Sequence, residues 1–388
     1  MMATKKYDEP PIAVPRDLDL LSLVGKKSYF LFGPRQTGKS FLIHQRLQGS
    51  RVYNLLDTAT FLTLSQNPGR ISEEIGPREK LVVIDEIQRV PTLLNEVHLL
   101  IEERGIRFLL TGSSPRKLRR GGVNLLGGRA RTAYLHPLTS NELGERFDLT
   151  RALHRGLLPA IYFSNDPDED LAAYAGTYLQ EEIAAEGAAR NIPAFSRFLK
   201  VAALCSGTMI NITNIASDAQ VPRTTVHEYF EILRDTLLLH ELPAWRKSAK
   251  RKPILTSKYY LFDVGVASHL QGRKVTPRTS EFGEAFEAFI MHELISWRDY
   301  RSGDALSYWR STSGYEVDFV LGDHTAVEVK AKENISPDDL RSLKAIAEEK
   351  RLKRCICVSL EKRSRRVDGI VILPYREFLA NLWDGQYK

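Results

Sequence analysis

The chain has 388 residues, and its 55 Lys and Arg against 48 Asp and Glu give a net charge of +7 and a sequence pI near 9.1. An apolar content of 43% excludes a disordered chain, and the length suggests two or three domains. The mild basic excess permits a nucleic-acid partner without requiring one. The N-terminal residues do not resemble a signal peptide, and no apolar run approaches the roughly 20 residues that span a bilayer. We therefore expect a cytoplasmic protein with no membrane partner.

A glycine-rich octapeptide follows the first apolar run of the chain. Residues 33–40 fit the pattern G-x-x-x-x-G-K-[ST], between an expected strand at 28–32 and an expected helix at 41–47. Glycines let backbone N–H groups surround phosphates, and a helix N-terminus adds partial positive charge. The motif alone also fits a plain turn between a strand and a helix. We predict an ATP-binding loop made of Gly33, Pro34, Arg35, Gln36, Thr37, Gly38, Lys39, Ser40 and Phe41.

Two carboxylates after a second apolar run decide between these alternatives. Leu81–Ile84 read as a buried parallel strand, and Asp85 and Glu86 follow at the end that meets a ligand crevice. Lys39 would contact the β- and γ-phosphates, while Ser40 and Asp85 would hold Mg²⁺. Glu86 would orient and deprotonate the attacking water. Together with the glycine loop, this pair predicts ATP hydrolysis with ATP and Mg²⁺ as cofactors.

The next strand and a basic stretch supply further candidates. The strand at 107–112 leads to Ser113, which could sense the γ-phosphate or could belong to a plain strand-end turn. An arginine cluster at 116–120 and Arg129 follow. One arginine could act as a charge-neutralising finger, in cis or from a neighbouring subunit, or the cluster could be a solvated basic loop. We choose Arg129 as the finger.

These motifs together resemble a known group of proteins. The chain is similar to the prokaryotic AAA-type ATPases related to the archaeal ATPase family, which carry an N-terminal ATPase domain and a C-terminal domain of unknown function. The resemblance assigns residues 1–155 to the ATPase domain. It rests on the octapeptide and on four later pieces, namely Val83-Ile84-Asp85-Glu86-Ile87-Gln88, Leu110-Thr111-Gly112-Ser113-Ser114, Gly128-Arg129 and Pro137-Leu138-Thr139.

Residues 156–270 carry the pattern of a winged helix-turn-helix. Two short helices flank a tight turn at 221–225, and two expected strands at 237–243 and 258–263 would form the wing. Thr224 or Thr225 could cap the second helix. DNA contacts would fall on Arg223, Thr224, Thr225 and His227, and the basic run at 246–252 could neutralise phosphates. The alternative is a scaffold or protein-contact lid with a solubilising basic loop.

Residues 275–388 combine an acidic helix with a charged hairpin. Because side chains alternate along a strand, Glu328 and Lys330 share one face, and Asp318 on the preceding strand could meet them. This segment resembles the PD-(D/E)xK nucleases. The resemblance implies that Asp318, Glu328 and Glu287 hold a metal ion and that Lys330 steers the water or phosphate. An exposed hairpin, or a nuclease-like fold kept for binding only, are the alternatives.

The sequence therefore predicts an α/β protein with three parts. A P-loop NTPase domain, with a parallel sheet between two layers of helices, precedes a winged helix-turn-helix and a small α/β nuclease-like domain. The leading function is a Mg²⁺-dependent ATPase that acts on or binds DNA. A nucleotide-gated adaptor for a protein partner is the rival. The sequence leaves homo-oligomer formation open.

Overall fold

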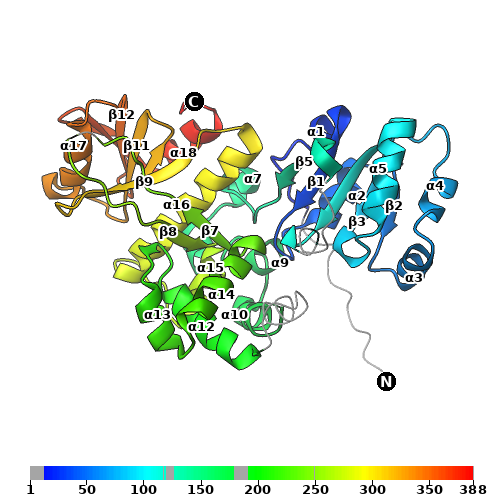
Figure 1. The fold of residues 1–388 in the computed structure, drawn as a ribbon. Helices are drawn as coiled ribbons and strands as arrows, with labels where there is room; N and C mark the ends of the chain where they lie inside the picture. The colour runs from blue at the N-terminus through cyan, green and yellow to red at the C-terminus, as the bar shows by residue number, and fades with distance from the viewer. Residues whose placement is uncertain (1–12, 117, 119–125, 179–190, 249, 388) are drawn as a thin grey trace, which may run out of the picture.

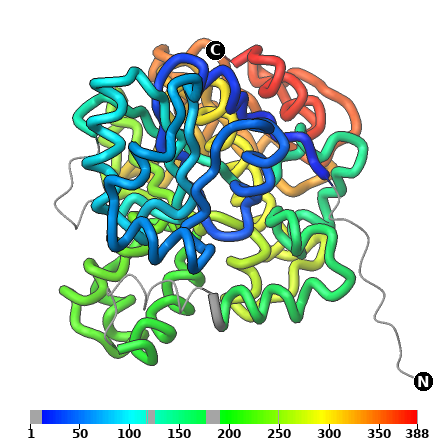
Figure 2. Tube along the Cα trace, turned by 90° about the vertical axis from the view of Figure 1, so that its right-hand side faces the viewer, coloured from blue at the N-terminus to red at the C-terminus, as the bar shows by residue number. Residues whose placement is uncertain are grey.

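The computed structural model describes residues 13–116, 118, 126–178, 191–248 and 250–387. Most of the arginine cluster expected at 116–120 lies outside these residues. Three bodies follow one another along the chain, coloured blue to cyan, green, and yellow to red in Figure 1. A view turned by 90° shows the same order (Figure 2). None of the helices in the described part of the chain has the length and apolar character that crossing a bilayer requires.

The first body is built on a five-stranded sheet in which every pairing is parallel, in the order β2-β3-β4-β1-β5. Its strands are β1 (Ser28–Phe32), β2 (Arg51–Asn54), β3 (Leu81–Asp85), β4 (Arg107–Gly112) and β5 (Ala130–Tyr134). Its helices are α1 (Leu20–Lys26), α2 (Lys39–Arg46), α3 (Thr58–Gln66), α4 (Arg70–Glu74) and α5 (Leu93–Arg104). Short 3₁₀ turns at Ile87–Arg89 and Leu126–Gly128 complete it.

Both faces of this sheet are buried. Side chains alternate along each strand, so a strand that is apolar throughout contributes apolar residues to both faces. On β1, Phe30 and Phe32 face one apolar cluster, which includes residues of α3, α4 and α5. Tyr29 and Leu31 face the other, which includes residues of α1 and α2. The prediction of a parallel sheet with helices on both faces is therefore confirmed.

The second body combines helices with a small antiparallel sheet in the order β6-β8-β7. Its strands are β6 (Thr208–Met209), β7 (Leu239–Leu242) and β8 (Lys258–Leu261). Its helices are α8 (Leu149–Arg155), α9 (Pro159–Tyr162), α10 (Pro167–Ala173), the π-helix Tyr174–Tyr178, α12 (Ile192–Leu204), α13 (Ile212–Ala219), α14 (Arg223–Asp235) and α15 (Val264–Gln271). Pro222 occupies the N-cap of α14, so the expectation that Thr224 or Thr225 caps this helix is wrong.

The third body holds a mixed six-stranded sheet in the order β13-β14-β12-β11-β10-β9. The elements are α16 (Ser280–Arg301), β9 (Leu306–Arg310), β10 (Glu316–Leu321), β11 (Thr325–Lys330), a 3₁₀ turn (Pro337–Leu340), α17 (Arg341–Ala347), β12 (Arg354–Ser359), β13 (Arg365–Val367), β14 (Ile370–Pro374) and α18 (Tyr375–Trp383). Strands β9, β10 and β11 form an antiparallel meander, whereas β11, β12 and β14 run parallel. The register of β10 on β9 shifts between Val317 and Val320, which brackets Asp318.

The connection between β7 and β8 lies along the β9 edge of this six-stranded sheet. Backbone hydrogen bonds join Trp245 to Tyr308 (2.7 Å) and Ile254 to Arg310 (2.8 Å). The connection thereby pairs with strand β9, which would otherwise be an open edge. We call residues 243–257 the strap.

Helix α16 shares one apolar core with the segment that leaves the first body. Phe147 stacks on Phe289 with ring centroids 5.5 Å apart, and both rings are buried. That segment carries α7 (Ser140–Leu143), the 3₁₀ turn Gly144–Arg146 and α8. Residues assigned by sequence to the end of the ATPase domain therefore pack in the core of the C-terminal body.

A fully buried carboxylate ties these pieces together. Glu293 of α16 accepts hydrogen bonds from the Ser140 backbone N–H (2.6 Å), the Ser140 hydroxyl (3.0 Å) and the Trp383 indole (2.8 Å). Burial nevertheless raises the pKa of Glu293 to about 7, from its ordinary value of 4.5. The folded state therefore binds this proton more tightly than the unfolded chain does.

We predict that Glu293→Gln flattens the pH dependence of stability. The contribution from the raised pKa is full below pH 4.5 and is lost as pH rises through 7. Wild type should lose about 3 kcal/mol relative to Glu293→Gln between these limits. Urea unfolding at several pH values measures it, with the exposed Glu103→Gln as control. Parallel pH profiles for wild type and Glu293→Gln would contradict the prediction.

Candidate nucleotide site and a carboxylate cluster

The glycine loop lies at the C-terminal end of β1, between β4 and β5. Gly33 passes so close to β5 that a Cβ there would lie 2.3 Å from the Leu135 carbonyl oxygen. Gly38 adopts the left-handed region with φ of 91° and leads directly into α2. The Lys39 ammonium folds back over the loop and donates to the carbonyls of Gly33 (2.7 Å) and Pro34 (3.0 Å). The loop therefore has the shape and the charge that phosphate binding requires.

The two side chains predicted to hold Mg²⁺ touch one another. The Ser40 hydroxyl donates to the Asp85 carboxylate at 2.8 Å. Thr111, at the end of β4, donates to the other oxygen of Asp85. A hydroxyl and a carboxylate beside a triphosphate are the oxygen donors that Mg²⁺ prefers, so these residues fit that ion.

Glu86 is held next to this pair in a strained backbone conformation. Its φ is 62°, a region that a non-glycine residue rarely adopts. Its carboxylate accepts a hydrogen bond from the Gln88 amide. Burial raises the pKa of Glu86 above its usual range. Gln88 in turn needs Gly112 opposite it, because a Cβ there would lie 2.4 Å from the Gln88 amide oxygen.

The predicted γ-phosphate sensor leads to a contact between bodies. Ser113 is buried at the end of β4, one residue after the pairing of Gly112 with Phe32 of β1. Three residues on, buried Arg116 forms an ion pair of 2.7 Å with Asp235, the last residue of α14. The sensor segment therefore contacts the helix whose first turn holds the predicted DNA-contact residues.

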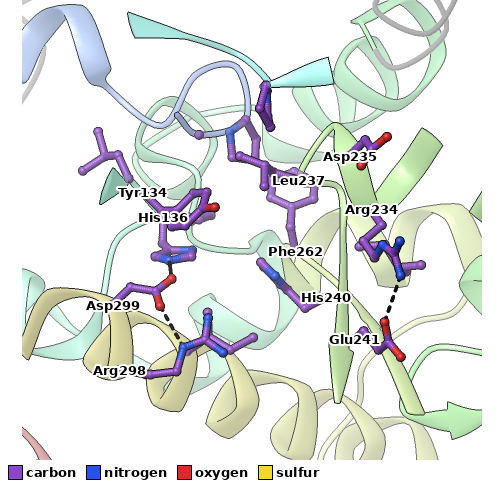
Figure 3. Close-up of a pocket in the computed structure, with 17 residues that line it drawn as sticks. Tyr134, His136, Arg234, Asp235, Leu237, His240, Glu241, Phe262, Arg298 and Asp299 are labelled. Carbon is purple, nitrogen blue, oxygen red and sulfur yellow. Dashed lines mark hydrogen bonds and ion pairs between the residues drawn. The ribbon is translucent and has the colours of Figure 1, made fainter. Parts of the chain in front are cut away.

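A cavity of about 300 Å³ lies where the three bodies meet, and Figure 3 shows its walls. Gly33 and Pro34 of the loop form part of its lining. His136 pairs with Asp299 of α16 at 2.8 Å, and His240 of β7 lies beside it with ring centroids 5.8 Å apart. Burial, reinforced by the neighbouring His136, lowers the pKa of His240 to about 3 and keeps its ring neutral at pH 7. Any shift of one body changes this cavity.

Arg129 lies far from the loop of its own chain. It precedes β5, whose first residue, Ala130, pairs with Ser28 at the start of β1. The loop follows the opposite end of β1. Arg129 forms an ion pair with Glu102 on the surface there. Its use as a finger in cis is therefore wrong, and a role toward a neighbouring subunit stays a prediction.

The predicted DNA contacts share the first turn and a half of α14. Arg223, Thr224 and His227 are exposed, and Thr225 is half-buried.

The basic run lies elsewhere, within the strap. There Lys247 pairs with Asp323 (2.5 Å) and Arg251 with Glu348 (2.8 Å). These two cations already have carboxylate partners inside the chain.

The third body gathers the residues that resemble a nuclease site. The Asp318 carboxylate accepts the backbone N–H of Val329 at 2.7 Å, and Lys330 donates to Glu328 at 2.5 Å. One oxygen of Glu328, Oε2, is buried without a hydrogen-bond partner. Burial raises the pKa of both Asp318 and Glu328. The negative charge of nearby Glu287 raises both pKa values further. The three predicted metal ligands are therefore close enough to influence one another electrostatically.

Two residues of β8 that the sequence analysis missed enter this cluster. The Lys258 ammonium lies 2.5 Å from Glu316 and 3.5 Å from Glu287. The Tyr260 hydroxyl donates to Glu287 at 2.6 Å. Carboxylates suit Mg²⁺, but ammonium groups already contact three of them. Within the described residues, no group of three or more His, Cys, Asp or Glu side chains is placed to hold a metal ion. In this arrangement the cluster therefore does not fit one.

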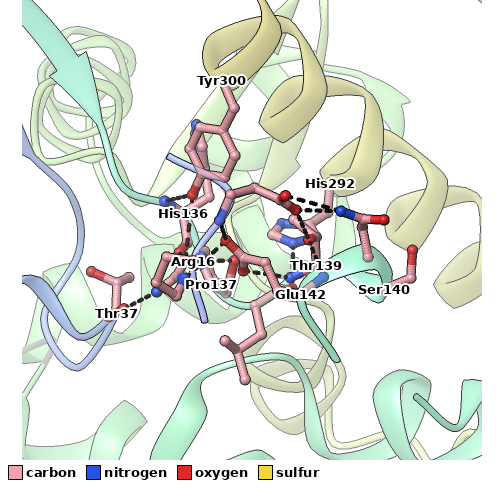
Figure 4. A network of polar contacts seen from close by, with 12 residues as sticks. Arg16, Thr37, His136, Pro137, Thr139, Ser140, Glu142, His292 and Tyr300 are labelled. Atoms are coloured by element: carbon pink, nitrogen blue, oxygen red, sulfur yellow. Dashed lines mark hydrogen bonds and ion pairs between the residues drawn. The ribbon is translucent and has the colours of Figure 1, made fainter. Parts of the chain in front are cut away.

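The sequence analysis also missed Arg16, which joins the loop to the rest of the chain (Figure 4). Its guanidinium donates to the carbonyls of Thr37 and His136, both at 2.6 Å, and forms an ion pair with Glu142 at 2.9 Å. Tyr300 of α16 lies 3.4 Å from it. Nothing in the local pattern around Arg16 signals these contacts, since its partners are far away in sequence.

Comparisons with known proteins agree with this geometry. Residues 25–144 match a family described as AAA domain. Residues 146–276 and 282–378 match two domains of unknown function, DUF8612 and DUF4143. Uncharacterized proteins of Mycobacterium tuberculosis and Mycobacterium bovis are each 26% identical over 369 residues, which cover 90% of this chain and 80% of theirs. An uncharacterized protein of Haemophilus influenzae is 22% identical over 341 residues, covering 79% of this chain and 80% of its own.

A solved structure was also matched, a signal transduction ATPase with numerous domains and a tetratricopeptide repeat sensor from Pyrococcus horikoshii. The match has 14% identity and a TM-score of 0.24, and it covers 77% of this chain. This chain spans about half the length of that structure, 49%.

The fold and the loop thus define the class: the first body is an AAA-type P-loop ATPase domain. The chain combines that domain with a C-terminal domain of unknown function, DUF4143.

We predict that Gly33→Ala weakens ATP binding at least about tenfold. The added Cβ would meet the Leu135 carbonyl oxygen, so either the loop or β5 must move, and phosphate contacts depend on the position of that loop. Gly25→Ala is the matched control, because a Cβ there meets nothing within 4 Å. Titration with a fluorescent ATP analogue measures both variants. Equal affinity of Gly33→Ala and Gly25→Ala would show that the loop tolerates the methyl group.

Proposed function

We propose that this protein is a Mg²⁺-dependent ATPase that acts on DNA through its two C-terminal bodies. The observation that carries the ATPase half is the contact between Ser40 and Asp85, which are adjacent in sequence to Lys39 and Glu86. DNA action rests on α14 and on the carboxylate cluster, and it is the part that experiments must decide.

The chain's own residues suggest how the chemistry would proceed. Phosphate oxygens would replace the Gly33 and Pro34 carbonyls as acceptors for Lys39. Ser40 and Asp85 would hold Mg²⁺, which neutralises charge that develops on the phosphates. Glu86, with its raised pKa and its amide partner Gln88, would orient the water and take its proton.

A direct path supports coupling between ATP and α14. The segment after Ser113 pairs with the last residue of α14 through Arg116 and Asp235. The 13 residues of α14 rise about 20 Å to its exposed first turn. Three helices and a small antiparallel sheet are also the parts of a winged helix-turn-helix, in which the equivalent helix enters the major groove. Arg223, Thr224, Thr225 and His227 would then face DNA.

The topology of the third body supports a nuclease-like fold. A helix, an antiparallel meander of three strands, a helix and a parallel strand follow in order. The shift in register that brackets Asp318 is the kind of β-bulge that re-aims side chains near active sites. Asp318, Glu328 and Lys330 come from neighbouring strands β10 and β11, and Glu287 comes from α16.

A nucleotide-gated adaptor that binds a protein partner is the second candidate. One observation favours it: the cations of the strap, Lys247 and Arg251, are paired within the chain. Paired cations release fewer counterions on binding DNA, and this lowers the electrostatic contribution to affinity. The adaptor predicts ATP turnover that DNA does not alter.

We predict that Lys39→Ala lowers the ATP hydrolysis rate roughly 10²–10³-fold, because a positive charge aimed at the transferring phosphate is removed. The exposed Lys26→Ala should behave as wild type. Rates are measured in Mg²⁺ with and without DNA. A wild-type rate from Lys39→Ala would show that the site is misassigned. DNA binding that does not weaken with salt, together with a rate indifferent to DNA, would favour the adaptor.

We predict that Asp318→Asn with Glu328→Gln abolishes metal-dependent DNA cleavage in the presence of ATP. Both carboxylates face the shared cluster, and the amides cannot supply the charge that a divalent ion needs. The exposed Asp338→Asn in the same body is the control. Gel assays on linear, circular and single-stranded DNA follow the product. Cleavage by the double variant at the wild-type rate, or none by wild type on any substrate, would refute a nuclease.

A further inference from the structure

Lys258 occupies a position that the proposed metal-dependent activity does not explain. It is the first residue of β8, in the small sheet of the second body, yet its side chain reaches the carboxylate cluster of the third. Its side chain is 4% exposed. A lysine is rarely buried unless carboxylates pair with it. The carboxylates of the cluster therefore explain why Lys258 can be buried here.

The charges around Lys258 account for its burial. Burial acts to lower the pKa of Lys258, but attraction to Glu287, Asp318 and Glu316 outweighs it and raises the pKa above the usual range. Tyr308 adds its ring face, 5.3 Å from the ammonium. The ammonium therefore stays charged and neutralises carboxylates that would otherwise repel one another.

Strand β8 also occupies Glu287, which is therefore not free to bind a metal ion in this arrangement. Tyr260, two residues after Lys258, donates to the Glu287 oxygen that Lys258 also approaches. Residues two apart share one face of a strand, so β8 presents both groups to the third body together. Meanwhile Glu328 Oε2 stays buried and unpartnered, which leaves a cation acceptor unused.

A way into the cluster exists on the same side. A cavity of about 180 Å³ between β8, α15 and α16 is lined by Lys258, Glu287 and Glu316 among others. A small hydrated cation could therefore reach the carboxylates if Lys258 moved aside.

We propose that Lys258 is an internal cation that keeps the carboxylate cluster closed to divalent metal in this arrangement. The inference rests on the proposed metal-dependent function, because it describes how the second body regulates that site. Movement of β8 withdraws Lys258 and Tyr260 together, which frees Glu287 and opens the cluster. We call Lys258 in this role the latch. Helix α16 carries both Glu287 and Asp299, and Asp299 lines the same cavity as Gly33 and Pro34 of the nucleotide loop. A change at the loop could therefore reach the latch through α16.

The test measures Mn²⁺ binding to the full chain without nucleotide. Electron paramagnetic resonance reports the concentration of the free ion at each step of the titration. Lys258→Met should raise the Mn²⁺ affinity of the cluster at least about tenfold, since an unpaired group of carboxylates attracts divalent cations. Lys258→Arg should stay closed like wild type, because it keeps the charge. Adding Asp318→Asn and Glu328→Gln to Lys258→Met should remove the gained ion. Lys247→Met, which removes an exposed paired lysine, is the matched control.

Each other outcome overturns the proposal. If wild type binds Mn²⁺ at the cluster as tightly as Lys258→Met, the latch is wrong while the proposed metal site survives. If neither binds it, the latch and the metal site fail together. An affinity gain in Lys258→Arg equal to that in Lys258→Met would show that packing, not charge, matters.

A second measurement needs no variant, in case Lys258→Met does not fold. In wild type the Lys258 amine should resist acetylation at least about tenfold longer than exposed Lys247, by mass spectrometry of timed samples, because a buried, ion-paired amine is poorly accessible. Equal rates at the two lysines would overturn the latch.

Discussion

The polar contacts of the buried Arg16 guanidinium are the constraint that joins the phosphate loop to helix α16. Taking a cation out of water costs several kcal/mol unless a carboxylate and enough acceptors replace the solvent. Glu142 supplies the charge, and the Thr37 and His136 carbonyls supply acceptors. These partners belong to the phosphate loop, the segment after β5 and α7. Because one side chain holds all three, the loop cannot shift without disturbing the route to α16.

Helix α16 extends that constraint across the molecule. Tyr300, near its C-terminal end, contacts Arg16, and its hydroxyl oxygen accepts a hydrogen bond from the His136 backbone N–H at 2.9 Å. Glu287, 13 residues earlier, faces β8 and the carboxylate cluster. At 1.5 Å per residue, these two positions are about 20 Å apart along one rigid element. The nucleotide loop and the carboxylate cluster are thus opposite ends of one mechanical connection.

Local patterns predicted the parts of this protein whose causes are local. Apolar runs gave the strands, and glycines gave the loop, because both follow from neighbours in sequence. The basic run at 246–252 read as a wing loop because its partners Asp323 and Glu348 lie some 75 to 100 residues away. Arg16 and Lys258 were missed for the same reason. Only the period-two placement of Lys258 and Tyr260 on one strand could have hinted that a charged side chain was facing inward.

The two acidic sites differ in what satisfies their carboxylates. Asp85 accepts hydrogen bonds from the hydroxyls of Ser40 and Thr111, which are neutral donors. At the carboxylate cluster, Lys258 from the second body and Lys330 from the third supply full charges instead. A neutral hydrogen-bond donor orients a ligand, whereas an ammonium competes with the metal for it. We therefore expect the first site to accept a cation as it stands, whereas under the proposed role of Lys258 the second must first release that ammonium.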